Sequence, residues 1–146
     1  MATPFLPMFN LFCHSVDGQL EFYRQLLGLQ EIVEASSPIY RVLTDGVLQI
    51  GFNGMPAYAL MGLQARQRDA SVDFAACSML TFVVQEPSLV DEARRKAEPA
   101  GGAVVKGPFA TYYGHWQVVI ADPEGNVMRL TCPSLPAGTQ APALEA

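Results

Sequence analysis

The residues with the clearest potential for ligand chemistry lie in one predicted hairpin, residues 115 to 131. Two runs rich in β-branched residues flank Asp122-Pro123-Glu124-Gly125-Asn126, where proline presets φ and glycine accepts a left-handed backbone, as in a tight turn. Pairing Asp122 with Asn126 sets the register, and side chains alternate across each strand. One face then carries His115, Gln117, Val119, Arg129 and Thr131. The other face carries Trp116, Val118, Ile120, Met128 and Leu130, whose apolar character predicts packing in a core.

Arg129 is the residue on the mixed face whose chemistry is most specific. A guanidinium can bind a carboxylate, phosphate or carbonyl group through two parallel hydrogen bonds. The alternative is an arginine at the rim, whose aliphatic stem covers apolar surface. No acidic residue shares the predicted face with Arg129. Because a buried guanidinium without a partner costs on the order of several kcal/mol, this arrangement favours a ligand as the partner.

His115 and the aromatic residues around it allow more than one role. An imidazole can act as a base near neutral pH, but the sequence places no carboxylate, nucleophile or metal ligand beside His115. His115 and Gln117 could equally be ordinary polar residues at the rim. Tyr112 and Tyr113 precede the hairpin and could stack on a ligand, whereas Trp116 points to the helix side in this register, which favours core packing.

The composition limits the possible partners and the compartment. The chain has 146 residues, of which 50% are hydrophobic and 16% charged, so we expect one folded domain with a substantial core. The net charge of -5 and the scattered Lys and Arg exclude a nucleic-acid footprint. No apolar run approaches the roughly 20 residues that span a bilayer. The N-terminus, MATPFLPMFNLF, has no basic segment, so we expect no secretory signal peptide. Three widely separated cysteines predict reduced thiols in a cytoplasmic protein.

The elements that would position these residues repeat along the chain. In the first half the patterns predict a strand at 8–13, a helix from Ser15 to Gly28, and strands at 29–35, 39–44 and 47–52. Asp45-Gly46 predicts a two-residue hairpin turn that places Gln49 opposite Val42. In the second half they predict a strand at 78–84, a helix opening at Pro87 and ending before Gly101, a strand at 103–106, and the hairpin at 115–131.

The fold class predicted from this order is α+β. Two β-α-β-β-β modules, residues 7–54 and 78–132, are joined by a connector at 55–77 and form one domain over residues 1–132. In each module the apolar face of the hairpin can pack on the module's helix, so the two mixed faces are free to curve into a cup. Residues 133–146 are rich in Pro, Ala and Gly, which predicts a disordered tail.

Two motifs resemble a known family. The run from Leu20 to Leu29, LEFYRQLLGL, is similar to the helix ending of the glyoxalase/bleomycin-resistance/dioxygenase (vicinal-oxygen-chelate) superfamily. Asp122-Pro123-Glu124-Gly125-Asn126 resembles its final hairpin, and Tyr113-Gly114-His115-Trp116 is similar to members of the bleomycin-resistance-like branch. The resemblance extends over residues 7 to 132 and implies a curved mixed sheet that forms a cup.

The resemblance also implies four positions at which the metalloenzymes of this superfamily bind their ion. In this sequence they fall on Met8, Gln49, Met79 and Arg129. Only the glutamine suits a hard or borderline divalent ion, because thioethers are poor ligands for such ions and arginine has no lone pair to donate. We therefore expect no metal and no cofactor, which disfavours metal-dependent glyoxalase or dioxygenase activity. The two methionines fit simple packing or a pocket that adapts to an irregular ligand.

The leading prediction is a small-molecule-binding protein with a metal-free cup and a small aromatic or anionic ligand, and the resemblance implies antibiotic resistance as a role. The predicted lining comprises Met8, Asn10, Gln49, Met79, Thr81, Tyr113, His115, Gln117 and Arg129. The alternative is an enzyme of the same superfamily, of lyase or dioxygenase type, with an atypical metal site or none. A third possibility is a cup that serves mainly for dimerisation. We expect a homodimer because an open sheet edge needs a partner.

Overall fold

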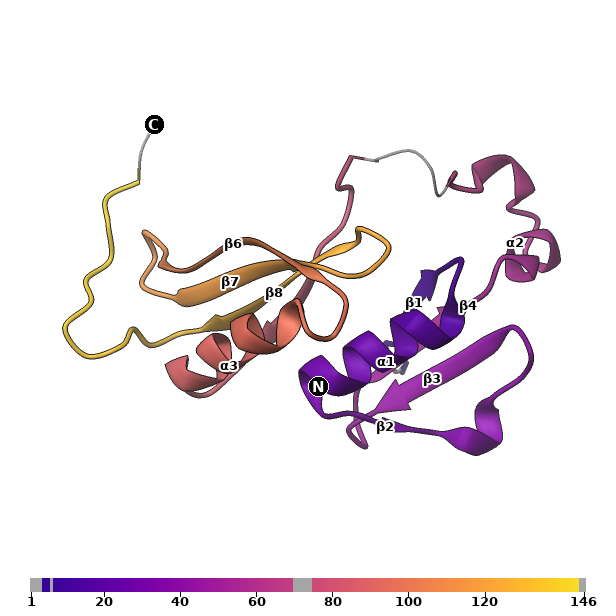
Figure 1. The fold of residues 1–146 in the computed structure, drawn as a ribbon, viewed down its shortest axis with the longest axis horizontal. Helices are drawn as coiled ribbons and strands as arrows, with labels where there is room; N and C mark the ends of the chain where they lie inside the picture. The colour runs from indigo at the N-terminus through magenta and orange to yellow at the C-terminus, as the bar shows by residue number, and fades with distance from the viewer. Residues whose placement is uncertain (1–3, 6, 70–74, 145–146) are drawn as a thin grey trace. The chain divides into compact units, whose positions relative to one another are not determined.

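The computed structural model describes residues 4–5, 7–69 and 75–144 (Figure 1). It divides into two compact units, Met1–Val72 and Asp73–Ala146, each of which is described by itself. Each unit contains one four-stranded mixed sheet and one long helix, so the protein is α+β, as predicted. None of the described helices has the length and apolar character needed to cross a membrane.

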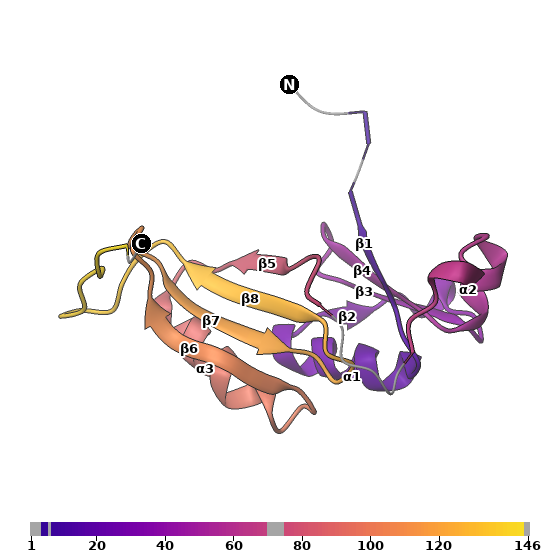
Figure 2. The same cartoon turned by 90° about the horizontal axis from the view of Figure 1, so that it is seen from above.

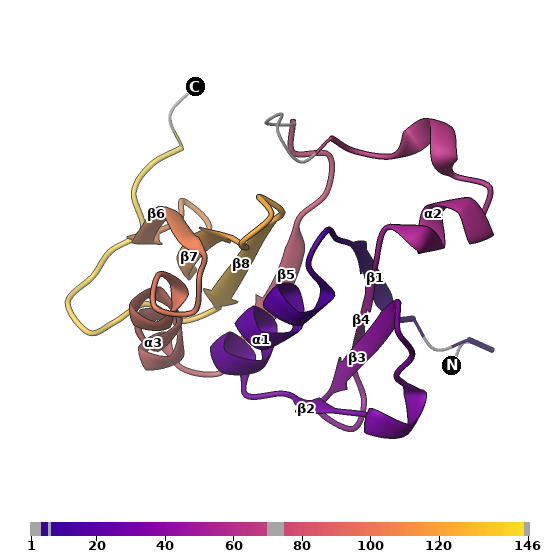
Figure 3. The same cartoon turned by 45° about the vertical axis from the view of Figure 1, so that its right-hand side comes forward.

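The sheet of the first unit has the strand order β1-β4-β3-β2. Its elements are β1 (Phe9–Phe12), α1 (Val16–Leu27), β2 (Gln30–Glu31), β3 (Tyr40–Thr44) and β4 (Gln49–Asn53), with η1 (Val33–Ala35), α2 (Pro56–Leu60) and η2 (Gln64–Arg66) in the connections. Strand β1 is parallel to β4, and the other pairs are antiparallel. Helix α1 packs on β3 and β4, on one face of the sheet (Figure 3).

Helix α1 begins and ends where the sequence predicts. The hydroxyl oxygen of Ser15 accepts a hydrogen bond from the Gly18 amide at 3.1 Å, which caps the first turn. Gly28 has φ 68°, and its amide donates to the Arg24 carbonyl at 2.9 Å, which closes the last turn. The helix buries Leu20 and Tyr23 against the sheet, so that strand and helix form one core.

The first hairpin differs from the prediction in its turn. Thr44 pairs with Gln49 and Val42 with Gly51, so the predicted pairing of Gln49 with Val42 is wrong. The Asp45 carboxylate accepts hydrogen bonds from the amides of Val47 at 2.9 Å and Leu48 at 2.7 Å. These bonds stabilise a turn of four residues instead of two. Since the register moves by two residues, Gln49 and Val42 still lie on the same face of the sheet, and Leu43, Ile50 and Phe52 are fully buried.

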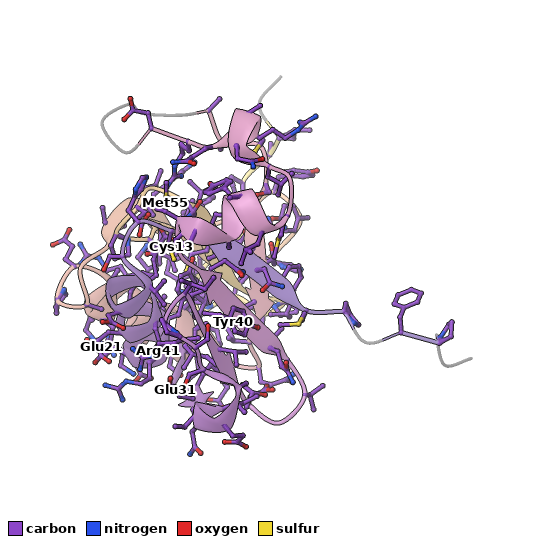
Figure 4. The ribbon with its side chains drawn as sticks, turned by 90° about the vertical axis from the view of Figure 1, so that its right-hand side faces the viewer. Cys13, Glu21, Glu31, Tyr40, Arg41 and Met55 are labelled. Atoms are coloured by element: carbon purple, nitrogen blue, oxygen red, sulfur yellow. The ribbon has the colours of Figure 1, made fainter. Side chains whose placement is uncertain are left out.

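The strand predicted at 29–35 is also shorter than expected. Only Gln30–Glu31 pairs with β3, and Val33–Ala35 form a 3-10 turn instead. The Ser36 hydroxyl donates to the Val33 carbonyl at 2.6 Å, which favours this local turn over sheet pairing. Arg41 on β3 donates two hydrogen bonds to the Glu31 carboxylate, from Nε and from Nη2, each at 2.7 Å (Figure 4). These bonds hold the short strand β2 against β3.

The sheet of the second unit has the strand order β5-β8-β7-β6. Its elements are β5 (Leu80–Val83), α3 (Pro87–Ala97), β6 (Ala103–Ala110), β7 (Trp116–Ala121) and β8 (Val127–Cys132). Helix α3 packs on β6, β7 and β8 and buries Val90, Ala93 and Ala97, as predicted (Figure 2). Strand β6 runs four residues beyond the predicted end at Lys106, because a bulge at Gly107 and Pro108 lets pairing resume at Phe109.

The predicted register of the last hairpin is confirmed. Val119 pairs with Arg129 and Gln117 with Thr131. The Asp122 amide donates to the Asn126 carbonyl at 2.8 Å, and Gly125 takes φ 88°. The residues assigned to the core face, Val118, Ile120, Met128 and Leu130, are all buried. The opposite face of this sheet therefore carries the polar residues that the sequence singled out.

Candidate functional site

Arg129 lies at the centre of a hydrogen-bonded cluster on the polar face of the second unit. Its Nε donates to the hydroxyl oxygen of Thr81 on the neighbouring parallel strand at 2.9 Å. Its Nη1 donates to the side-chain carbonyl of Gln117 at 3.2 Å and to the Tyr113 hydroxyl at 3.3 Å. Three predicted site residues thus contact the predicted arginine, and they come from β5, β7 and the loop between β6 and β7.

The loop before β7 determines where Tyr113 points. The Thr111 amide donates to the His115 carbonyl at 2.8 Å, and the His115 amide donates to the Thr111 hydroxyl at 2.9 Å. Gly114 completes the loop with φ 86°. In this loop the Tyr113 ring packs edge-on against the His115 ring at 4.8 Å, and its hydroxyl donates to Gln117 at 3.1 Å. The same hydroxyl also accepts a hydrogen bond from Arg129. Stacking of the Tyr113 ring on a ligand stays a prediction.

His115 has a partner that the sequence reading did not identify. Its Nδ1 lies 2.9 Å from the hydroxyl oxygen of Thr131, which is buried on β8. Within the described residues, Nε2 of His115 has no hydrogen-bond partner. One ring nitrogen is therefore held by the protein, and the other is available to a ligand.

The charge on this face is positive, although the chain as a whole is acidic. Lys106 on β6 and Arg129 on β8 are the charged residues that the strand register places there, and none of these strand positions carries Asp or Glu. Every hydrogen-bond partner of Arg129 among the residues with described positions is a neutral oxygen, and its Nη2 has none. An anion could therefore bind without displacing an existing ion pair.

The polar face of the first unit is organised around a glycine. Asn10 on β1 pairs with Gly51 on β4, and the Asn10 side-chain oxygen accepts a hydrogen bond from Asn53 at 3.0 Å. A Cβ atom on Gly51 would lie 2.3 Å from this oxygen and 2.7 Å from the Tyr40 hydroxyl. Burial raises the pKa of Tyr40. Glycine is thus the residue that lets Asn10 and Tyr40 approach the strand.

The parallel strand pairs of the two units correspond residue by residue, and this correspondence does not match Gln49 with Arg129. Asn10 and Gly51 pair across β1 and β4 as Thr81 and Arg129 pair across β5 and β8. The counterpart of Arg129 in the first unit is therefore Gly51, and Gln49 corresponds instead to the first residue of β8. The two last-strand positions inferred from the resemblance differ by two residues along the sheet.

The remaining predicted lining residues, Met8, Met79 and Gln49, lie outside the hydrogen-bonded cluster around Arg129. Met8 and Met79 each lie directly before an edge strand and are 39% and 42% exposed, respectively. Gln49 is exposed at the start of β4. Trp116 points to the core side, where its indole nitrogen donates to Asp91 on α3 at 2.9 Å, in agreement with its predicted role.

Sequence reasoning missed three residues on the face of the second unit. The alternation along the strand placed Thr131 on the same face as Arg129, but Thr131 was not included in the predicted lining. Lys106 lies in the strand predicted at 103–106 but was not assigned to the site, and Phe109 lies beyond the predicted end of that strand. The ammonium group of Lys106 lies 4.2 Å from the centre of the Phe109 ring, a cation–π contact.

The donor set does not fit a divalent metal ion. Nowhere in the described part of the chain do three or more His, Cys, Asp or Glu side chains gather in a way that could hold one. Arg129 stands at the last-strand position for which the resemblance implied a metal ligand, and a guanidinium has no lone pair to donate.

The fold and the polar sheet face define a class of proteins built from two β-α-β-β-β modules. The sequence matches the Glyoxalase/Bleomycin resistance protein/Dioxygenase superfamily over residues 6–130, and the chain belongs to this superfamily. No protein with a curated description matches the chain.

Several solved structures are similar to this chain. A glyoxalase/bleomycin resistance protein/dioxygenase family enzyme from Burkholderia phytofirmans PsJN has 36% identity and a TM-score of 0.79, with 86% of this chain and 95% of that chain covered. A hypothetical protein from S. aureus has 19% identity and a TM-score of 0.71, with 90% and 95% covered. The fosfomycin resistance protein FosX from Listeria monocytogenes has 13% identity and a TM-score of 0.66, with 92% and 95% covered. The last two similarities show the fold alone.

Proposed function

We propose that this protein binds a small anionic ligand, without a metal ion, on the polar face of the second unit. Arg129 is the anchor, and Thr81, Tyr113 and Gln117 hold its side chain in place. The observation that carries the proposal is the free Nη2 of Arg129, on a face whose strand positions carry two cations and no acid. The N–H groups of Nη2 can donate charge-assisted hydrogen bonds to the oxygen atoms of a carboxylate, a phosphate or a phosphonate.

The binding test uses isothermal titration calorimetry with acetate, phosphate, benzoate, 2-naphthoate and fosfomycin. We expect at least one of these anions to bind, and we expect Arg129→Ala to weaken it by about 1.5–3 kcal/mol, or tenfold to 150-fold, because a hydrogen bond to a charged group is lost. Arg95→Ala is the matched control, since Arg95 is an exposed arginine on α3 and should leave affinity unchanged. Failure of every anion to bind, or equal affinities for the wild type and Arg129→Ala, would contradict the proposal.

The metal-free part of the proposal has its own measurement. Elemental analysis of the purified protein should find no stoichiometric transition metal, because the residues at the expected ligand positions are poor donors. The affinity for the bound anion should likewise be unchanged after incubation with a chelator. One equivalent of metal that is lost together with anion binding would show that unexpected residues form a metal site.

A second candidate is an enzyme of the same superfamily, and one observation favours it. Nε2 of His115 has no partner in the described structure, and the similar Burkholderia protein is described as an enzyme. An imidazole in this position could exchange a proton with a bound ligand. Mass spectrometry of a ligand recovered after incubation distinguishes the two candidates: a binding protein returns it unchanged, whereas an enzyme converts it at a rate that His115→Gln abolishes.

Antibiotic resistance is a further expectation within this proposal. The Listeria protein of the same fold is described as conferring fosfomycin resistance. Expression of the wild-type chain in a sensitive bacterium should raise the inhibitory concentration of fosfomycin or bleomycin if either is a ligand. The Arg129→Ala variant should not do so.

A further inference from the structure

We propose that the C-terminal tail, residues 133–144, forms one wall of a ligand subsite that takes the aromatic part of an aromatic anion. This inference rests on the proposed function, because the anionic group of the same ligand would bind at Arg129. The tail would then contribute to specificity instead of being a dispensable extension of the domain.

The subsite is a cavity of about 270 Å³ within the second unit. Phe109 and Tyr112 line it from the end of β6 and the following loop, and Pro142, Ala143 and Leu144 line it from the tail. Tyr112 is 54% exposed and Leu144 is 66% exposed, so apolar surface on both walls remains uncovered. A flat ring between the two walls would remove this surface from water.

A turn in the tail directs the chain back toward the sheet. After Cys132, at the buried end of β8, the Thr139 amide donates to the Pro136 carbonyl at 3.1 Å. Gly138 in this turn has φ 81°, a conformation that glycine adopts readily. The yellow segment of Figure 1 leaves β8, reverses, and continues past β6. Prolines at 133, 136 and 142 reduce the conformational entropy that ordering the tail would cost.

The subsite adjoins the anion site because the two share residues. Tyr113 and Gln117 line the cavity, and both accept hydrogen bonds from Nη1 of Arg129. Lys106 also lines the cavity and places a second cation beside the Phe109 ring. A ligand with one ring system and one anionic group would therefore place its ring in the cavity, between Phe109, Tyr112 and Leu144, while its charge lies near the guanidinium. The small volume favours one or two fused rings over a larger skeleton.

The test compares two carboxylates on the full-length chain and on two variants. Acetate reports the anion site alone, and 2-naphthoate reports the anion site plus the subsite. We expect the full-length chain to bind 2-naphthoate at least about tenfold more tightly than acetate, because a buried ring adds apolar contact. A chain that ends at Gln140 should lose this preference, while its affinity for acetate should stay within about twofold.

A point variant keeps the test valid if the shortened chain does not fold. Leu144→Ser should weaken 2-naphthoate binding about threefold to tenfold and leave acetate binding unchanged, since it removes one apolar wall only. Leu60→Ser is the matched control, because Leu60 is an exposed leucine on α2 in the other unit.

Three outcomes would overturn the subsite. They are an undiminished affinity of the shortened chain for 2-naphthoate, an unchanged affinity of Leu144→Ser for it, and an equal loss of both carboxylates in either variant. Failure of the proposed function is distinguishable from these results, because neither carboxylate would then bind to the full-length chain, or Arg129→Ala would bind both normally.

Discussion

Arg129 and Thr81 are joined by a hydrogen bond across two parallel strands, with Nε of the arginine 2.9 Å from the threonine oxygen. The bond occupies the Nε–H group of the guanidinium, while Gln117 and Tyr113 accept from Nη1. The side chain is thereby held in one orientation, with Nη2 available. Preorganisation of this kind lowers the entropy that a ligand would otherwise have to offset on binding.

The first prediction concerns Thr81→Val, which keeps the shape of the side chain and removes its oxygen. We expect anion affinity to fall about threefold to tenfold, since one hydrogen bond that orients the arginine is lost. The measurement is calorimetric titration with the tightest-binding anion. In an Arg129→Ala background the same change should have no further effect, and an additive loss in the double variant would show that Thr81 acts independently of Arg129.

The second prediction concerns the sign of the charge at position 129. Arg129→Glu should abolish anion binding, because a carboxylate would replace the cation that attracts the ligand. The free energy of unfolding, measured with urea, should change by about 1 kcal/mol or less, as for a partly exposed residue outside the core. Retained anion binding in this variant would place the ligand elsewhere on the protein.

The third prediction concerns Gly51. Gly51→Ala should lower the free energy of unfolding by about 1–3 kcal/mol, because the added methyl group would displace Asn10 and Tyr40. The backbone itself permits alanine, since Gly51 is not among the residues with positive φ. Urea denaturation of the single variant and of Gly51→Ala with Asn10→Ala provides the measurement. The double variant should recover part of the loss, and no recovery would mean that Asn10 is not the obstructing group.

The fourth prediction concerns the pH dependence of stability through Glu31 and Arg41, which lie together in Figure 4. The hydrogen bonds from Arg41 hold the pKa of Glu31 below its usual range, so the carboxylate stabilises the folded state above the unfolded pKa of about 4.3. This stabilisation is lost as the pH falls through the lower pKa of the folded state. Glu31→Gln should therefore cost about 1 kcal/mol at pH 7 and progressively less below pH 4.

Thermal unfolding at a series of pH values tests this fourth prediction. Asp17 also contacts Arg41, so the arginine keeps one acidic partner in the variant, which limits the loss. Glu34→Gln is the control, because Glu34 is exposed and makes no hydrogen bond to any residue that the structure describes. A difference between wild type and Glu31→Gln that stays constant from pH 7 to pH 3 would contradict the assignment.

The fifth prediction concerns the oligomeric state. Strands β1 and β2 are the edges of the first sheet, and β5 and β6 are the edges of the second. Unpaired edges favour association, so we expect a homodimer with about twice the chain mass of 15.8 kDa. Light scattering at micromolar concentration measures this mass directly. A single species with the mass of one chain would contradict the prediction.

The features of the structure that depend on neighbouring residues could be predicted from the amino-acid sequence. The caps of α1 at Ser15 and Gly28 follow from local hydrogen bonding and backbone freedom, and both are confirmed. The turn from Asp122 to Asn126 carries enough local chemistry to set the register of the last hairpin, and the register places Arg129 on the polar face. The superfamily followed from the same motifs, because they recur at equivalent places in the fold.

Features that depend on distant residues, or on two competing local conformations, became visible only in the folded protein. The Asp45 carboxylate selected a four-residue turn over the two-residue turn that Asp-Gly predicts, since its bonds to the next amides stabilise the wider loop. A bulge carried β6 past Pro108, which sequence rules treat as a strand end. The bond between Thr81 and Arg129 joins residues 48 positions apart. Parallel pairing of strands that far apart has no local signal, so only the folded structure could show which of the predicted lining residues form hydrogen bonds with Arg129.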